Sequence, residues 1–287
     1  MTMRSMETLT RGTPLAVIGI CLLLAGPQLS AQTAKDLVAD ACYNERHQRQ
    51  QKALWASRVE RRAGGHVYRE EEIETVEGPV RRLLAVDGHE PSPSERKQDD
   101  DRLQGLMQNP KARQTLKKNR ETDEKKFEDL LRVIPDAFLF EDEGRQGGLE
   151  KLAFRPNPGY SPVTYEETVL QAMSGVILID LQEKRLALLA GALMHQVSFG
   201  YGLIGHVNQG GTIEIHRTRI SSGRWKTSSS KINLEGRFIF FKTISKQLDE
   251  TRFDFEPVAP DMTIQRAVEQ MSRNEPPQLK RLFEKRS

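Results

Sequence analysis

Three glycines in the run 199–205, FGYGLIG, match G-x-G-x-x-G, the pattern that dinucleotide-binding enzymes use to hold a pyrophosphate. That chemistry requires a helix that opens within the glycines, because the amides at a helix N-terminus bind the phosphates. Here the run HVNQGGTIEI follows, and its Gly-Gly pair and alternating residues predict a turn and a strand. We therefore interpret the glycines as part of a hairpin, and we predict no cofactor.

The other catalytic patterns also lie in the wrong elements. Ser228 and Lys231 fit S-x-x-K, but they lie in a polar turn between predicted strands and not at the start of a helix. His195, His206 and His216 fall in consecutive predicted strands with no cysteine beside them, so we interpret them as ordinary polar positions and predict no metal. We predict a protein that is not an enzyme; an enzyme with an unrecognised site stays an alternative.

The N-terminus predicts export. Arg4 and Arg11 precede the apolar run 14–26, and the run Leu29-Ser30-Ala31, which ends in small residues, offers a cleavage site. The apolar run is shorter than the roughly 20 residues that span a bilayer. A cleavable signal peptide over 1–31 is therefore favoured over an uncleaved membrane anchor, and it predicts a periplasmic or secreted protein.

The exported chain should begin near Gln32 with a helix over 34–52. Cys42 falls on the apolar side of this helix and is expected to be buried, whereas the polar run after it, NERHQRQQK, is expected to be solvated. The whole chain has 43 basic and 40 acidic residues, so it lacks the strong positive charge that would indicate a nucleic-acid partner.

Short alternating runs separated by glycine and proline predict strands on both sides of a helical stretch over 91–135. Pro110 is expected to divide this stretch into two helices that lie on the surface, and Pro135 to end the second. The run Asp99-Asp100-Asp101 fits no calcium loop and is interpreted as a solvated face. A C-terminal helix and a basic tail are predicted for 261–287.

The strands and helices together predict an α+β fold, an open antiparallel barrel of about eleven strands over 32–260 with helices packed in or over its concave face. Several strands, such as GVILIDL, RLALLAG and GRFIFFKT, are apolar on both faces. Both faces of such strands are expected to be shielded from water. Either helices pack on one face and the other face lines a cavity, or the strands belong to a tight two-layer core.

A signal peptide, an N-terminal helix, a long antiparallel sheet interrupted by helices and the absence of a catalytic motif resemble the LolA/LolB-like periplasmic lipoprotein carriers and their RseB-type relatives. GVILIDLQEKRLALLAG, followed by a glycine-rich turn, a strand and Trp225, is similar to the repeated strands of the outer-membrane lipoprotein-sorting proteins. The resemblance implies an unclosed barrel whose apolar concave face holds acyl chains without catalysis, and it assigns no binding residue.

The expected partner is accordingly a lipid or lipoprotein acyl group, with an envelope protein or peripheral membrane contact as further partners. The alternative is an envelope interaction or sensor module with the same fold, in which the chain's own helices fill the cavity. The candidate residues of an apolar cavity are Trp55, Leu178, Phe199, Ile213, Ile215, Trp225, Phe238 and Phe240.

Overall fold

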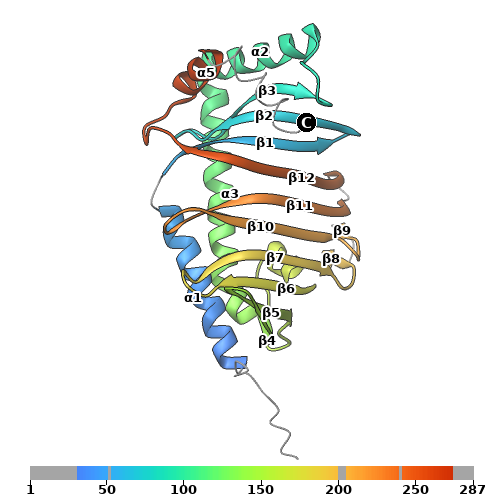
Figure 1. The fold of residues 1–287 in the computed structure, drawn as a ribbon. Helices are drawn as coiled ribbons and strands as arrows, with labels where there is room; N and C mark the ends of the chain where they lie inside the picture. Colours follow the sequence, from blue (N-terminus) through green and yellow to red (C-terminus); the bar gives the residue numbers. More distant parts are fainter. Residues whose placement is uncertain (1–30, 51–52, 200–204, 239–240, 274–287) are drawn as a thin grey trace, which may run out of the picture.

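One large antiparallel sheet with helices on it makes up the computed structural model of this chain (Figure 1). The structure describes residues 31–50, 53–199, 205–238 and 241–273. The predicted signal peptide lies outside these residues apart from Ala31, and so does the basic tail. Within the described part of the chain, no helix is long and apolar enough to cross a bilayer.

The sheet contains twelve strands among the described residues. Its order is β3-β2-β1-β12-β11-β10-β7-β6-β5-β4, and the short hairpin β8-β9 joins it through β11. The edge strands β3 and β4 do not pair with each other, so the sheet is open, and the predicted α+β class is confirmed with one strand more than expected. The strands are β1 (Trp55–Ala63), β2 (His66–Ile73), β3 (Val80–Val86), β4 (Phe138–Gln146), β5 (Leu149–Pro156), β6 (Met173–Asp180), β7 (Arg185–Leu193), β8 (Val197–Phe199), β9 (Gly205–Val207), β10 (Thr212–Ser221), β11 (Arg224–Phe238) and β12 (Phe241–Pro257).

Helices cover one face and one end of this sheet (Figure 1). α1 and α3 run across the strands, and α2 and α5 lie beside the edge strand β3. α1 packs on α3 and on β4, β6 and β7. The helices are α1 (Ala31–Gln50), α2 (Pro93–Gln108), α3 (Pro110–Ala137), α4 (Tyr165–Leu170) and α5 (Ile264–Arg273).

The hairpin predicted from FGYGLIG is present. β8 and β9 pair antiparallel, with Phe199 opposite Gly205, and the strand β9 begins at the third glycine. Residues 200–204 lie outside the described residues. The described strands on either side of the run are therefore antiparallel neighbours, as the sequence predicts, whereas the prediction about Gly200 and Gly202 themselves falls outside the described residues.

The boundary between α2 and α3 follows from local chemistry. The Asn109 side chain accepts hydrogen bonds from the backbone N–H groups of Lys111 (3.0 Å) and Ala112 (3.2 Å), and Pro110 is the first helical residue. The prediction that Pro135 ends this helix is wrong, because α3 continues to Ala137. The lost backbone hydrogen bond affects only the final turn, and burial of that turn in the core outweighs it.

Two separate apolar clusters form the core. The larger cluster lies between α1, the C-terminal part of α3 and the strands β4 to β8, and it includes Val38, Leu131, Leu152, Ile177 and Ile179. The smaller cluster lies between β2, β3, α2 and α5, and it includes Ile73, Val80, Leu103, Ile264 and Met271. α3 connects them, because Leu116 packs on the smaller cluster and Ile134 belongs to the larger one.

The doubly apolar strands β6 and β7 bury one face in the larger cluster, and the other face is partly exposed. Ile177 and Ile179 of β6 are buried in the larger cluster, whereas Leu178 between them pairs with Leu188 of β7 on the opposite face and is partly exposed. The cavity described below does not include Leu178 or Leu188, and the expectation that this second face of β6 and β7 lines a cavity stays a prediction. Most of the run GRFIFFKT lies outside the residues whose side chains are described.

Two further expectations about polar segments are wrong. Glu45, in the polar half of α1, is only 1% exposed, because Arg185 provides a partner 140 residues away. Asp99 is also buried, and its carboxylate accepts a hydrogen bond from the Leu83 N–H (3.1 Å). The stretch predicted to lie on the surface is therefore anchored in both clusters through α2 and α3.

Candidate ligand-binding cavity

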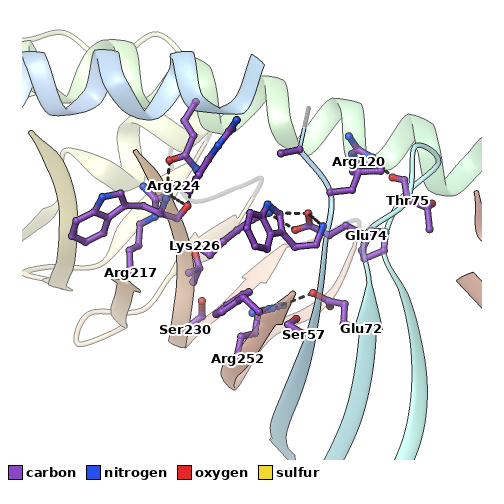
Figure 2. Close-up of a pocket in the computed structure, with 18 of the residues that line it drawn as sticks. Ser57, Glu72, Glu74, Thr75, Arg120, Arg217, Arg224, Lys226, Ser230 and Arg252 are labelled. Atoms are coloured by element: carbon purple, nitrogen blue, oxygen red, sulfur yellow. Dashed lines mark hydrogen bonds and ion pairs between the residues drawn. The ribbon is translucent and has the colours of Figure 1, made fainter. Parts of the chain in front are cut away.

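A cavity of about 540 Å³ lies over the middle of the sheet, between the two apolar clusters. Strands β1, β2, β3, β10, β11 and β12 provide its floor, and the helices contribute Gln48 of α1 with Arg120 and Glu124 of α3. Figure 2 shows Arg120 on the helical side of the cavity. Its apolar walls include Leu54, Trp55, Leu248 and Phe255. The volume is within the range of roughly 300–1,000 Å³ that small-molecule sites occupy.

Charged side chains dominate the rest of the lining. Six are basic and three are acidic: Arg81, Arg120, Arg217, Arg224, Lys226 and Arg252, with Glu72, Glu74 and Glu124. In Figure 2 the basic residues of β10 and β11 lie across the cavity from Glu72 of β2 and from Glu74, which follows that strand. This lining is opposite in character to the apolar cavity that the resemblance implies.

Most of these charges are paired across elements. The Lys226 ammonium on β11 donates to both carboxylate oxygens of Glu74, at 2.7 and 2.8 Å, so that β11 is connected to the end of β2. The Arg120 guanidinium donates to Glu124 (2.7 Å) and to the backbone carbonyl of Thr75 (2.6 Å), which connects α3 to the same end of β2.

A second group of charges crosses three strands of the floor. Arg81 of β3 and Arg252 of β12 both donate to Glu72 of β2, at 2.6 and 3.2 Å, and both also donate to Glu250 of β12. Burial raises the pKa of the Glu250 carboxyl, but the hydrogen bonds and charges of Arg81 and Arg252 outweigh it and hold that pKa below its ordinary value of 4.5.

A buried network connects the cavity to α1. The Glu45 carboxylate accepts two hydrogen bonds from Arg185 of β7, at 2.9 and 3.0 Å, and forms an ion pair with Arg217 of β10. One turn along α1, Gln48 accepts from the Trp225 N–H (2.9 Å) and donates to its carbonyl (2.7 Å). The buried Trp225 indole donates to Glu183 (2.6 Å), and this hydrogen bond lowers the pKa of Glu183.

The eight candidate residues divide among several places. Trp55 and Trp225 both line the cavity. Phe199 and Ile213 belong to or pack on the larger cluster, and Ile215 pairs with Leu189 of β7, which also packs there. Leu178 lies on the opposite face of the sheet. The Phe238 side chain and all of Phe240 lie outside what the structure describes.

The sequence reasoning missed the charged half of the lining. Glu72 and Glu74 come from the run YREEEIE, and Arg224 and Lys226 from RWKTSS; no site role was predicted for these charges. The available signal was the presence of charged residues within runs that otherwise predict sheet, next to the tryptophans Trp55 and Trp225. A search for an apolar cavity could not use that signal.

The charged side chains of the lining are fixed by one another. Each of the three lining carboxylates accepts a hydrogen bond from a basic side chain. Within the part of the chain that the structure describes, no three metal-binding side chains come together; His195 is exposed, and His216 pairs with Glu214 (2.6 Å). The cavity can enclose a small molecule and present fixed charges to it.

These features define an open-sheet α+β protein with a ligand-sized, charged cavity. Comparisons with protein-family models, curated proteins and solved structures return no significant match to this chain. Any proposal for its function therefore rests on the fold and on the geometry of the cavity.

Proposed function

We propose that this chain is a non-catalytic binding protein of the cell envelope that holds a small amphiphilic ligand, such as a lipid or a lipoprotein acyl group. The observation that carries the proposal is the cavity of about 540 Å³, which lies between two packed clusters and has both apolar and charged walls. An acyl chain would lie against Trp55, Leu248 and Phe255, and its polar end would face the charges.

Quenching of tryptophan fluorescence tests this proposal directly. The chain has two tryptophans, and both line the cavity. A brominated fatty acid, 12-bromododecanoic acid, should quench their emission because the bromine comes into contact with the indoles. Thr227→Phe should weaken the quenching at least about tenfold by filling the cavity, since Thr227 lines it.

Thr212→Phe is the matched control, because Thr212 is an exposed residue on the neighbouring strand β10. It should leave the quenching unchanged. Protein isolated from an envelope fraction should also carry acyl chains that mass spectrometry detects in its lipid extract. Absence of both quenching and bound acyl chains would refute the proposal.

One observation favours a second candidate function, an interaction or sensor module with a self-filled concavity. α1 and α3 fill the face of the sheet along β4 to β7, where Val38, Leu131 and Ile177 are all buried. In this role the envelope partner would be a protein. Crosslinking in intact cells should then recover one stoichiometric protein partner, while the quenching experiment gives no signal.

Export is the cellular part of the proposal, and it rests on the leader pattern in 1–31. The mature protein should be recovered from the periplasm or medium with an N-terminus near Gln32. Mass spectrometry of the intact protein tests this, and a mature chain that retains the leader would contradict it.

A further inference from the structure

The basic side chains of the cavity differ in whether they have a partner. Five of the six have a carboxylate partner in or directly behind the lining. Lys226 pairs with Glu74, Arg120 with Glu124 and Arg217 with Glu45. Arg81 and Arg252 share Glu72 and Glu250.

Arg224 is the sixth basic residue. In the part of the chain that the structure describes, no hydrogen bond or ion pair joins its side chain to another group, although it lines the cavity and is partly buried. It begins β11 directly after the tight turn at Gly223, whose φ of +66° favours glycine. The turn fixes the backbone from which this side chain extends, beside Arg217 and Lys226 (Figure 2).

Arg224 is therefore a lining cation without a partner among the described residues, at a defined place in the cavity. A guanidinium donates two parallel hydrogen bonds to a carboxylate or phosphate, and this fork geometry makes arginine a specific partner for such groups. The paired cations already satisfy carboxylates of the chain, and an anion that binds them must displace those carboxylates. An anion that binds Arg224 displaces no carboxylate of the described residues.

We propose that the ligand carries one anionic group, a carboxylate or a phosphate, that pairs with Arg224 while its apolar part lies against Trp55 and Phe255. The inference rests on the proposed function, because it assigns the head group of the ligand held in that cavity. A single carboxylate or phosphate matches the single unpaired cation. A ligand with a neutral head would leave Arg224 without a partner in a partly buried site, which costs binding free energy.

Isothermal titration calorimetry with probes that share a chain and differ in the head group tests this inference. Dodecanoate and dodecyl phosphate should bind at least about tenfold more tightly than dodecanol, all below their micellar concentrations. Inorganic phosphate should bind at least about tenfold more weakly than dodecyl phosphate, because it has no apolar part. Equal binding of the two phosphates would overturn the assignment of an amphiphile.

Arg224→Gln is the decisive variant. It should reduce the preference for dodecanoate over dodecanol to within about twofold, because dodecanoate loses its ion pair and dodecanol has none to lose. Arg224→Lys should recover part of the preference, since it restores the charge without the fork. Arg155→Gln, at an exposed position of β5, is the matched control and should change neither affinity.

The two proposals can fail separately. If wild-type protein binds dodecanol and dodecanoate equally, or if Arg224→Gln keeps the full preference, the assignment of Arg224 is overturned and the proposed function stands. If Lys226→Met abolishes the preference and Arg224→Gln does not, the anion binds at the β2 end of the cavity instead, and the inference is again overturned. If no probe binds, both proposals are overturned.

Discussion

The helix α3 crosses both halves of the helix-covered face of the sheet, but one half is a packed core and the other contains the cavity. Along β4 to β7, α3 and α1 pack on the sheet and exclude water, and Leu152 and Ile179 are fully buried. Along β1, β2 and β12 the same helix α3 crosses a floor of arginine and glutamate residues and leaves a cavity. The first half provides stability, and the second half provides space for a ligand.

The residue types along α3 change from charged beside the cavity to apolar beside the larger cluster. Its C-terminal part carries Phe127, Leu131 and Ile134, which pack in the larger cluster. Its middle carries Arg120 and Glu124, which line the cavity. Apolar side chains pack against one another and exclude water, whereas charged side chains favour contact with water. The change of residue type along α3 therefore determines where the interior is packed and where a cavity remains.

The connection between the halves should be the most sensitive point of the molecule. Glu45→Ala leaves Arg185 and Arg217 as uncompensated charges in a buried network, so it should lower the free energy of unfolding by about 3–5 kcal/mol. Asp40→Ala, on the same helix, breaks an ion pair with Lys184 in which both side chains are about half exposed. That control should cost less than about 1 kcal/mol.

Urea unfolding of the two variants at neutral pH measures both effects. Equal, small losses would mean that the two halves do not depend on the Glu45 network.

The packed half should respond to cavity-creating substitutions. Ile177→Ala removes a side chain that is 2% exposed and should lower the free energy of unfolding by about 2–4 kcal/mol. Leu178→Ala, next to it on the partly exposed opposite face, should cost at most about 1–2 kcal/mol. Equilibrium urea unfolding gives both values, and similar losses would contradict the assignment of the two faces.

Calorimetry of the folded Ile177→Ala protein sharpens the comparison. It should bind dodecanoate as wild type does, because Ile177 does not line the cavity.

Local signals predicted much of the sheet. Gly64 and Gly65 adopt positive φ in the turn between β1 and β2, and Asn109 with Pro110 marks the start of α3, as sequence rules expect. Glu45 was assigned to solvent because its partner Arg185 is distant in the sequence and no local pattern indicates it. The charged lining of the cavity was missed for the same reason, since its side chains come from several strands and from α3.

The charged half should show its own dependence on pH. The pKa of Glu250 is lowered in the folded protein, so its contribution to stability is complete above 4.5 and is lost as the pH falls through the folded pKa. Glu71 acts in the opposite direction, because burial raises its pKa. The comparison is therefore between wild type and Glu250→Gln by urea unfolding on both sides of pH 4.5.

Wild type should exceed Glu250→Gln in the free energy of unfolding above pH 4.5, and the difference should shrink at lower pH. The effect should be smaller than the losses above, since the side chain of the partner Arg81 is 25% exposed. A difference that does not change with pH would show that the pair with Arg81 and Arg252 does not hold Glu250 in its charged form.

Thiol labelling distinguishes the halves with the smallest change to the protein. Burial in the larger cluster raises the pKa of Cys42 to about 12, so at neutral pH on the order of one thiol in 10⁵ is ionised and native protein starting at Gln32 should not react with a disulfide reagent. A cysteine at Thr227, which lines the open cavity, should react in the native state. Both should react fully in urea. If native Cys42 reacts as fast as Thr227→Cys, the packed half opens as readily as the cavity, and the division into a solid half and a hollow half is wrong.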